Sequence, residues 1–248
     1  MSMIARSLEQ FRPHHEELRQ RLMKVFLALA LCSGFAYIFS ENIARFFIEP
    51  LFTASPYLDH LVYTNLPEAF LSYLKLSLLV GIVISFPFTL FQVWMFIAPG
   101  LLGNEKKFAV TVVFWATLLF GAGAVFAMFG VLPRMLLYFM SYAGESLEPL
   151  PKFGQYLTFV ARTVLAFGLS FEIPFLMVMA GKAGFVKAEY FRKQRLYFYA
   201  AIVFMAFLLT AGDFMATGLL AIPLFFLYEA GIFLTALFGK KKPEAVSE

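Results

Sequence analysis

Among the acidic side chains in or beside the long apolar runs of this 248-residue sequence, two are the first candidates for chemistry. Glu172 lies within FGLSFEIPF (167–175), and Glu105 lies near the end of FQVWMFIAPGLLGNEKK (91–107), directly before two lysines. A carboxylate in apolar surroundings can exchange a proton or accept a cation, and it pairs best with the planar fork of an arginine. These residues therefore offer proton exchange or recognition of a cationic group.

Glu172 is too deep in its apolar run to reach either end of it. It lies about nine residues, or about 13 Å along a helix, from the C-terminal end of the run. Pro174 removes its own backbone donor and frees the carbonyl of Ser170, which makes this stretch polar and kinked. Two interpretations stay open: a functional carboxylate, or a structural one satisfied by an interhelical hydrogen bond.

Glu105 has an ordinary interpretation as a solvated loop carboxylate. A pair with Lys106 or Lys107 would contribute at most about 1 kcal/mol. Leu101 and Leu102 keep the loop apolar, however, so the carboxylate is expected close to the bilayer surface, where a cationic peptide would meet it.

The segment PHHEELRQRL (13–22) predicts a helix that begins near Pro13. Glu17 and Arg21 stand four residues apart, the spacing of an ion pair on one helix face. The alternative interpretation is an amphipathic helix beside the membrane with a solvated charged face.

Three further ionisable residues lie within predicted spans. Lys75 and Arg162 are close enough to the outer ends of their spans for their long side chains to reach the interface. Glu229, about two turns from the inner end of its span, is equally compatible with a structural and a functional role.

The composition predicts a membrane protein. Apolar residues make up 61% of the chain, charged residues only 15%, and 33 residues are phenylalanine. Several runs exceed the roughly 20 apolar residues that cross a bilayer. The single cysteine, Cys32, excludes a disulfide within the chain. Because 24 mostly polar residues precede the first long run, we expect an uncleaved first span.

We predict an all-α, polytopic protein that forms one integral membrane domain over residues 1–248. Its six transmembrane helices are expected at about 24–42, 67–97, 108–132, 155–181, 196–211 and 214–237. The fifth and sixth helices are expected to be short, and a short span thins the bilayer around it. The proline-rich segment 43–66 is expected to pack as a cap on the outer face.

The distribution of basic residues predicts the orientation. Of the 20 Lys and Arg residues, 15 lie in the N-terminal segment, in the 98–107 and 182–195 loops and in the tail. Cytoplasmic segments carry such an excess, so both termini are expected in the cytoplasm.

Sequence signatures of catalysis are missing. The chain has no phosphate-binding G-x-x-x-x-G-K-[ST] motif, no H-E-x-x-H and no G-x-S-x-G. Its histidines, His14, His15 and His60, are not spaced as metal ligands. We therefore expect no enzymatic activity, no cofactor and no metal, and we attribute the +4 net charge to membrane orientation and not to nucleic-acid binding.

The motifs together resemble one family from about residue 14 to residue 235. They are HHEELRQRL, the external Pro50-Leu51, FQVWMFIAPGLLGNEKK, FGLSFEIPF and LLAIPLFFLYEAGIF (219–233), in family order and at family spacing. The chain resembles TatC, the polytopic subunit of the twin-arginine protein translocase.

The resemblance implies a function. Proteins similar to this one recognise the twin-arginine signal peptides of folded cargo and work with single-span subunits of the TatA and TatB type. They lie in the bacterial inner membrane in multi-copy complexes, in contact with membrane lipid, and the proton-motive force drives transport.

The resemblance also implies two groups of site residues. The signal-peptide surface comprises Glu105, Glu17, Arg19, Arg21, Phe96, Pro99 and Leu101. Intramembrane or partner contacts and the mechanism are associated with Glu172, Asp213 and Pro50. The turn before Asp213 lacks the prolines common in the family, and Thr217 replaces a common glutamine, so no role is carried over to Thr217.

A different functional class is compatible with the same residues. In a proton-coupled small-solute secondary transporter, Glu172 and Arg162 would be proton or substrate ligands at mid-depth.

Overall fold

The computed structural model describes residues 3–54, 58, 60–97, 106–142, 150–210 and 212–239, with side chains from residue 15 onward except those of 97 and 106–109. These residues are helical apart from turns, bends, short stretches without regular structure and one isolated bridge, between Val62 and Lys152, which confirms the all-α prediction. The elements are α1 (Met3–Ile38), α2 (Ser40–Ala54), α3 (Leu66–Ile97), α4 (Lys106–Val125), a π-helical segment (Phe126–Val131), α5 (Leu132–Met140), α6 (Phe153–Lys182), α7 (Ala188–Lys193), α8 (Arg195–Leu209) and α9 (Phe214–Phe238).

Within the described residues, five helical segments are long and apolar enough to cross a membrane, and α8 is a shorter apolar helix. The long segments are His15–Ile38, Leu66–Phe96, Val110–Met140, Phe153–Lys182 and Phe214–Phe238. The predicted fifth span is short, because the 15 residues of α8 cover only about 22 Å. The description of the sixth as short is corrected: α9 has 25 residues and covers about 37 Å, since Pro223 lies inside it without ending it.

Three predicted boundaries differ from the structure. The first span was expected to begin at about residue 24 and begins at His15. The helix expected to begin near Pro13 begins at Met3, because a proline withholds only its own backbone donor and the preceding turns can still form. The span expected to end at residue 132 continues to Met140 through the π-helical segment. Pro133 follows this wider turn, and the Arg134 guanidinium donates to the carbonyl of Gly130.

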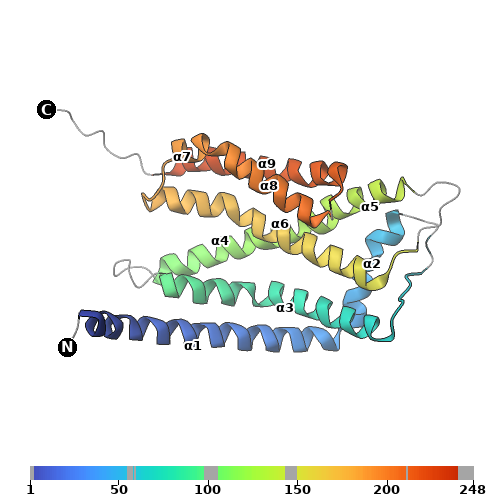
Figure 1. The fold of residues 1–248 in the computed structure, drawn as a ribbon, viewed down its shortest axis with the longest axis horizontal. Coiled ribbons are helices and arrows are strands. Elements are labelled where there is room, and N and C mark those ends of the chain that lie inside the picture. The colour runs from blue at the N-terminus through green and yellow to red at the C-terminus, as the bar shows by residue number, and fades with distance from the viewer. Residues whose placement is uncertain are drawn as a thin grey trace. The chain divides into compact units, whose positions relative to one another are not determined.

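The chain forms two compact units, and the first contains Met1–Phe46 and Thr64–Leu118. In this unit α1 packs along α3 (Figure 1). A Cβ atom on Gly81 would collide with the backbone and side chain of Ser33, so glycine permits this close approach. Tyr37 meets Phe70 edge-on with ring centroids 6.4 Å apart. Early residues of α1 face late residues of α3, so the two helices are antiparallel.

The second unit contains Phe47–Tyr63 and Leu119–Glu248 and is centred on α6, which packs against α9 and the π-helical segment, while α8 packs on α9. The crossing of α6 and α9 is tight, because a side chain on Gly231 would meet Pro174 and Met177. Residues 47–63 join the start of α6: the Tyr156 hydroxyl donates to the carbonyl of Phe47 over 2.8 Å.

Candidate functional site

The first group of predicted site residues meets where α1 and α3 lie together in the first unit. The Arg21 Nε atom donates to Glu17 Oε1 over 2.9 Å, and Arg21 Nη1 donates to Gln92 Oε1 over 3.3 Å. The i, i+4 ion pair predicted from the sequence is thereby confirmed. We call Glu17, Arg21 and Gln92 the α1–α3 cluster.

Sequence reasoning missed Gln92, which is buried with 7% of its surface exposed. A buried amide needs a hydrogen-bond partner, and Arg21 supplies one from the neighbouring helix. The sequence did contain a signal for this residue, because Gln92 is the only amide side chain in α3. Phe96 follows it by one turn and is half-buried.

Of the remaining residues predicted for the signal-peptide surface, the structure describes only Arg19. Arg19 is exposed on α1, and no described side chain pairs with it. Pro99, Leu101 and Glu105 lie outside the described residues, so their predicted roles stay predictions.

Glu172 lies buried on α6 in the second unit, with 6% of its surface exposed. Its carboxyl group lies beside the backbone of Phe120 on α4, and Oε1 has no hydrogen-bond partner among the described residues. The α4–α6 contact is close, because a Cβ atom on Gly123 would collide with the carbonyl of Phe167. The structural interpretation, a fully satisfied interhelical hydrogen bond, therefore does not account for Oε1 within the described part of the chain.

Asp213 caps the N-terminus of α9 after a tight turn. Its Oδ1 atom accepts from the backbone N–H of Ala216 over 2.6 Å, and Gly212 before it has a φ of +93°, which favours glycine. The Tyr138 hydroxyl of α5 lies 3.4 Å from the same oxygen.

Thr210 and Thr217 flank this turn and were not assigned a role from the sequence. Their hydroxyl groups lie 2.8 Å apart in a buried hydrogen bond, and Thr217 also donates to the carbonyl of Asp213. The signal in the sequence was two threonines three and four residues to either side of an aspartate. The hydroxyl pair ties the end of α8 to the start of α9.

The predicted intramembrane and partner residues are not brought together. Gly231 of α9 lies against Pro174, next to Glu172, and Asp213 lies 18 residues earlier on α9, about 27 Å along the helix. Pro50 lies inside α2, before the fully buried Leu51. These residues therefore occupy separate places in the second unit.

The other ionisable residues in the apolar helices have local explanations. Glu229 accepts hydrogen bonds from Arg195 Nη2 and from the Tyr199 hydroxyl, each over 2.6 Å, which ties α9 to α8. Lys75 and Arg162 are exposed, as expected of side chains that extend toward the interface. No group of three potential metal ligands occurs among the described residues.

The fold and these clusters define a class: a polytopic helical membrane protein with charged and polar clusters on separate helices. Comparison with known proteins identifies the family. The profile of the family described as "Sec-independent protein translocase protein (TatC)" matches residues 13–223. The chain belongs to the TatC family, and it is accordingly a protein-translocase component and not an enzyme.

Individual relatives agree along nearly the whole chain. The Sec-independent protein translocase protein TatC of Desulforapulum autotrophicum is 36% identical over 94% of this chain and 86% of its own length. The protein of the same name from Aquifex aeolicus is 35% identical over 93% of this chain and 96% of its own length. A crystal structure of the twin-arginine translocase receptor TatC superposes with a TM-score of 0.82 at 34% identity, covering 90% of this chain and 98% of that one. The prediction of a multi-pass membrane protein of this family is confirmed.

Proposed function

We propose that this protein recognises the twin-arginine signal peptides of folded cargo at the cytoplasmic face of the bacterial inner membrane. Both termini lie in the cytoplasm in this proposal, as the 15 basic residues on one side predict. The protein recruits single-span subunits of the TatA and TatB type into a multi-copy complex, and the proton-motive force drives export.

The observation that supports recognition best is the state of the Glu17 carboxylate. Arg21 uses only Oε1 of Glu17, and the Glu17 side chain is 37% exposed. Oε2 therefore has no partner among the described residues and can accept an incoming guanidinium. Because Arg21 neutralises Glu17, a second carboxylate is needed to attract a dication, and Glu105 supplies it in this proposal.

Arginine suits this site better than lysine. Its planar guanidinium can bond both a carboxylate and a neighbouring acceptor in a fixed geometry, whereas an ammonium acts as a point charge. The proposal therefore predicts discrimination between two cations of equal charge. The apolar part of the peptide would lie along Phe96, Pro99 and Leu101.

The remaining residues serve later steps in the proposal. Glu172, with its buried and unpartnered Oε1, is the polar position within the membrane that this proposal assigns to a later step of transport. Asp213, which caps α9, and Pro50, which lies inside α2, contribute to transport in this proposal, as the family resemblance implies. The 15-residue α8 thins the bilayer nearby and eases passage of a folded domain.

The test is binding of a labelled twin-arginine peptide to the purified protein, measured by fluorescence anisotropy. A twin-lysine peptide, Glu105→Ala and Glu17→Gln are each expected to weaken binding at least tenfold. Glu16→Gln is the matched control, because Glu16 is exposed one residue away on another helix face. Equal binding in all cases would overturn the proposal.

A further inference from the structure

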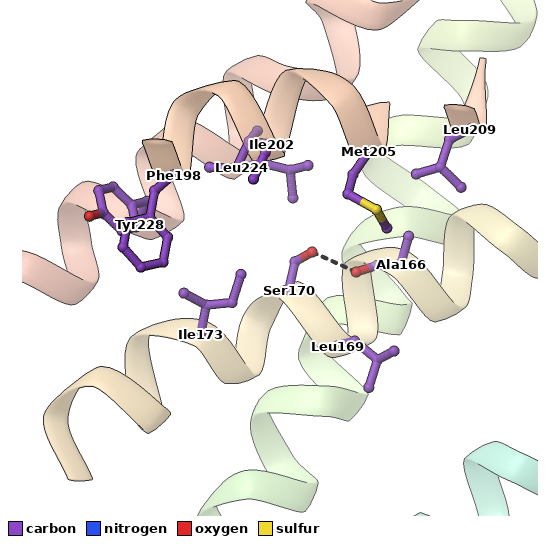
Figure 2. Close-up of a pocket in the computed structure, with 11 residues that line it drawn as sticks. Ala166, Leu169, Ser170, Ile173, Phe198, Ile202, Met205, Leu209, Leu224 and Tyr228 are labelled. Atoms are coloured by element: carbon purple, nitrogen blue, oxygen red, sulfur yellow. Dashed lines mark hydrogen bonds between the residues drawn. The ribbon is translucent and has the colours of Figure 1, made fainter. Parts of the chain in front are cut away.

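An apolar slot opens between α6, α8 and α9 in the second unit (Figure 2). Its volume is about 300 Å³. Its floor consists of the buried side chains of Ile202, Leu224 and Tyr228, whereas Leu169, Ala201 and Met205 at its mouth are exposed. The slot is therefore open to whatever surrounds the second unit, and in a membrane-spanning helix bundle that is lipid or another protein.

The slot offers only apolar contact to an occupant. Two hydroxyl groups belong to its lining, and both are already used: Ser170 donates to the carbonyl of Ala166 over 2.6 Å, and Tyr228 donates to the carbonyl of Phe191 over 2.8 Å. Because both hydroxyl protons are already donated, neither hydroxyl offers a donor to an occupant, and a polar ligand would lose most of its hydrogen bonds there.

The length of the slot matches one acyl chain. Along α8 it extends from Phe198 to Leu209, about 16 Å. This is about half of the roughly 30 Å hydrocarbon core, the depth that a single lipid tail reaches. A transmembrane helix is about 10–12 Å wide with its side chains and packs best on small residues, whereas Leu169 and Met205 at the mouth are large. An acyl chain therefore fits better than a partner helix.

One end of the slot carries a cation suited to a phosphate. Arg195 lies three residues before Phe198, on the same stripe of α8, and its side chain is 46% exposed. Arg195 Nη2 donates a hydrogen bond to Glu229 Oε2, and the other N–H donors of the guanidinium stay available. The exposed charged residues of the adjoining α7 are Glu189, Arg192 and Lys193. Cations are thus in excess at this end.

We propose that the apolar slot holds one acyl chain of an anionic phospholipid whose phosphate lies at Arg195. The lipid then fills the space between α6 and α8 and becomes part of the second unit. This site is independent of the signal-peptide surface on α1 and the loop before α4.

Native mass spectrometry of the full chain in detergent, titrated with dioleoylphosphatidylglycerol, tests this site. Ala201→Phe places a ring in the mouth and is expected to weaken binding of the most tightly held lipid about tenfold, the equivalent of about two buried methylene groups. Ala200→Phe is the matched control, because Ala200 is exposed on α8 and does not line the slot. Its lipid affinity is expected to stay within twofold of the unmodified protein.

The headgroup is tested with dioleoylglycerol, which has the same chains without the phosphate and is expected to bind at least tenfold more weakly. The proposal would be overturned if Ala201→Phe and Ala200→Phe bound phosphatidylglycerol equally tightly. It would also be overturned if the unmodified protein bound the two lipids equally tightly. Loss of a single-span partner in Ala201→Phe with unchanged lipid affinity would assign the slot to a helix instead. Ala201→Leu, a smaller filling, replaces the phenylalanine variant if that variant does not fold. Twin-arginine peptide binding should not change in any of these variants.

Discussion

Replacement of Asp213 separates what its carboxylate does for the fold from what it does for transport. The Oδ1 atom caps α9 through the Ala216 N–H at 2.6 Å, and an alanine there loses the cap, which costs about 1 kcal/mol. Loss of the negative charge at a helix N-terminus costs about 0.5 kcal/mol more. The Tyr138 contact adds little, since 3.4 Å exceeds the usual range for two oxygens.

These contributions give a quantitative expectation for two variants. Asp213→Ala should lower the Tm of the protein in detergent by about 3–6 °C, at about 2–4 °C per kcal/mol for a chain of this size. Asp213→Asn keeps a capping oxygen and loses only the charge, so its Tm should fall by about 1–2 °C.

Thermal unfolding followed by circular dichroism measures both shifts, and export of a twin-arginine reporter from cells measures function. Because the family resemblance associates Asp213 with transport, we expect Asp213→Asn to reduce export despite its near-normal Tm. If the Asn variant loses as much stability as the Ala variant, the capping argument is refuted. If it exports normally, the carboxylate is a structural cap and nothing more.

Three further outcomes are expected. Gly81→Ala should destabilise the first unit by about 1–3 kcal/mol, because the new Cβ atom has no room against α1. Gly34→Ala places its Cβ atom in open space and should leave the Tm unchanged or higher. Equal effects of the two variants on the Tm would contradict the close approach of α1 and α3. Gln92→Leu removes an acceptor of Arg21 and should weaken twin-arginine peptide binding with little loss of Tm, as measured by anisotropy and circular dichroism. Glu172→Gln should leave the Tm within about 2 °C, since it removes a buried carboxyl group with an unpartnered oxygen, yet reduce reporter export; normal export would argue against its proposed role.

The sequence predicted those parts of the site that depend on local spacing. The Glu17–Arg21 pair follows from the helical repeat, and the turn at Gly212-Asp213 follows from the residue types. The membrane spans follow from hydropathy alone, and their positions agree with the helices within a few residues except at the start of the first span and the end of the third.

Contacts between helices could not be predicted in this way. Gln92 meets Arg21 only because of the register of α1 against α3, and that register depends on the close approach at Gly81. A single sequence contains the glycine but not its partner helix. The Thr210–Thr217 bond likewise depends on how the end of α8 meets the start of α9, and the π-helical segment before Pro133 was not predicted.

In the proposed function, the arginine pair of a signal peptide binds at Glu17 and Glu105. The most direct measurement is a photo-crosslink from a benzophenone placed beside the two arginines of a synthetic signal peptide, mapped by mass spectrometry on the purified protein. Crosslinks concentrated in residues 15–24 and 98–107 are predicted, and they should disappear with the twin-lysine peptide. Crosslinks that concentrate in α6 to α9 and persist with the twin-lysine peptide would contradict binding at Glu17 and Glu105.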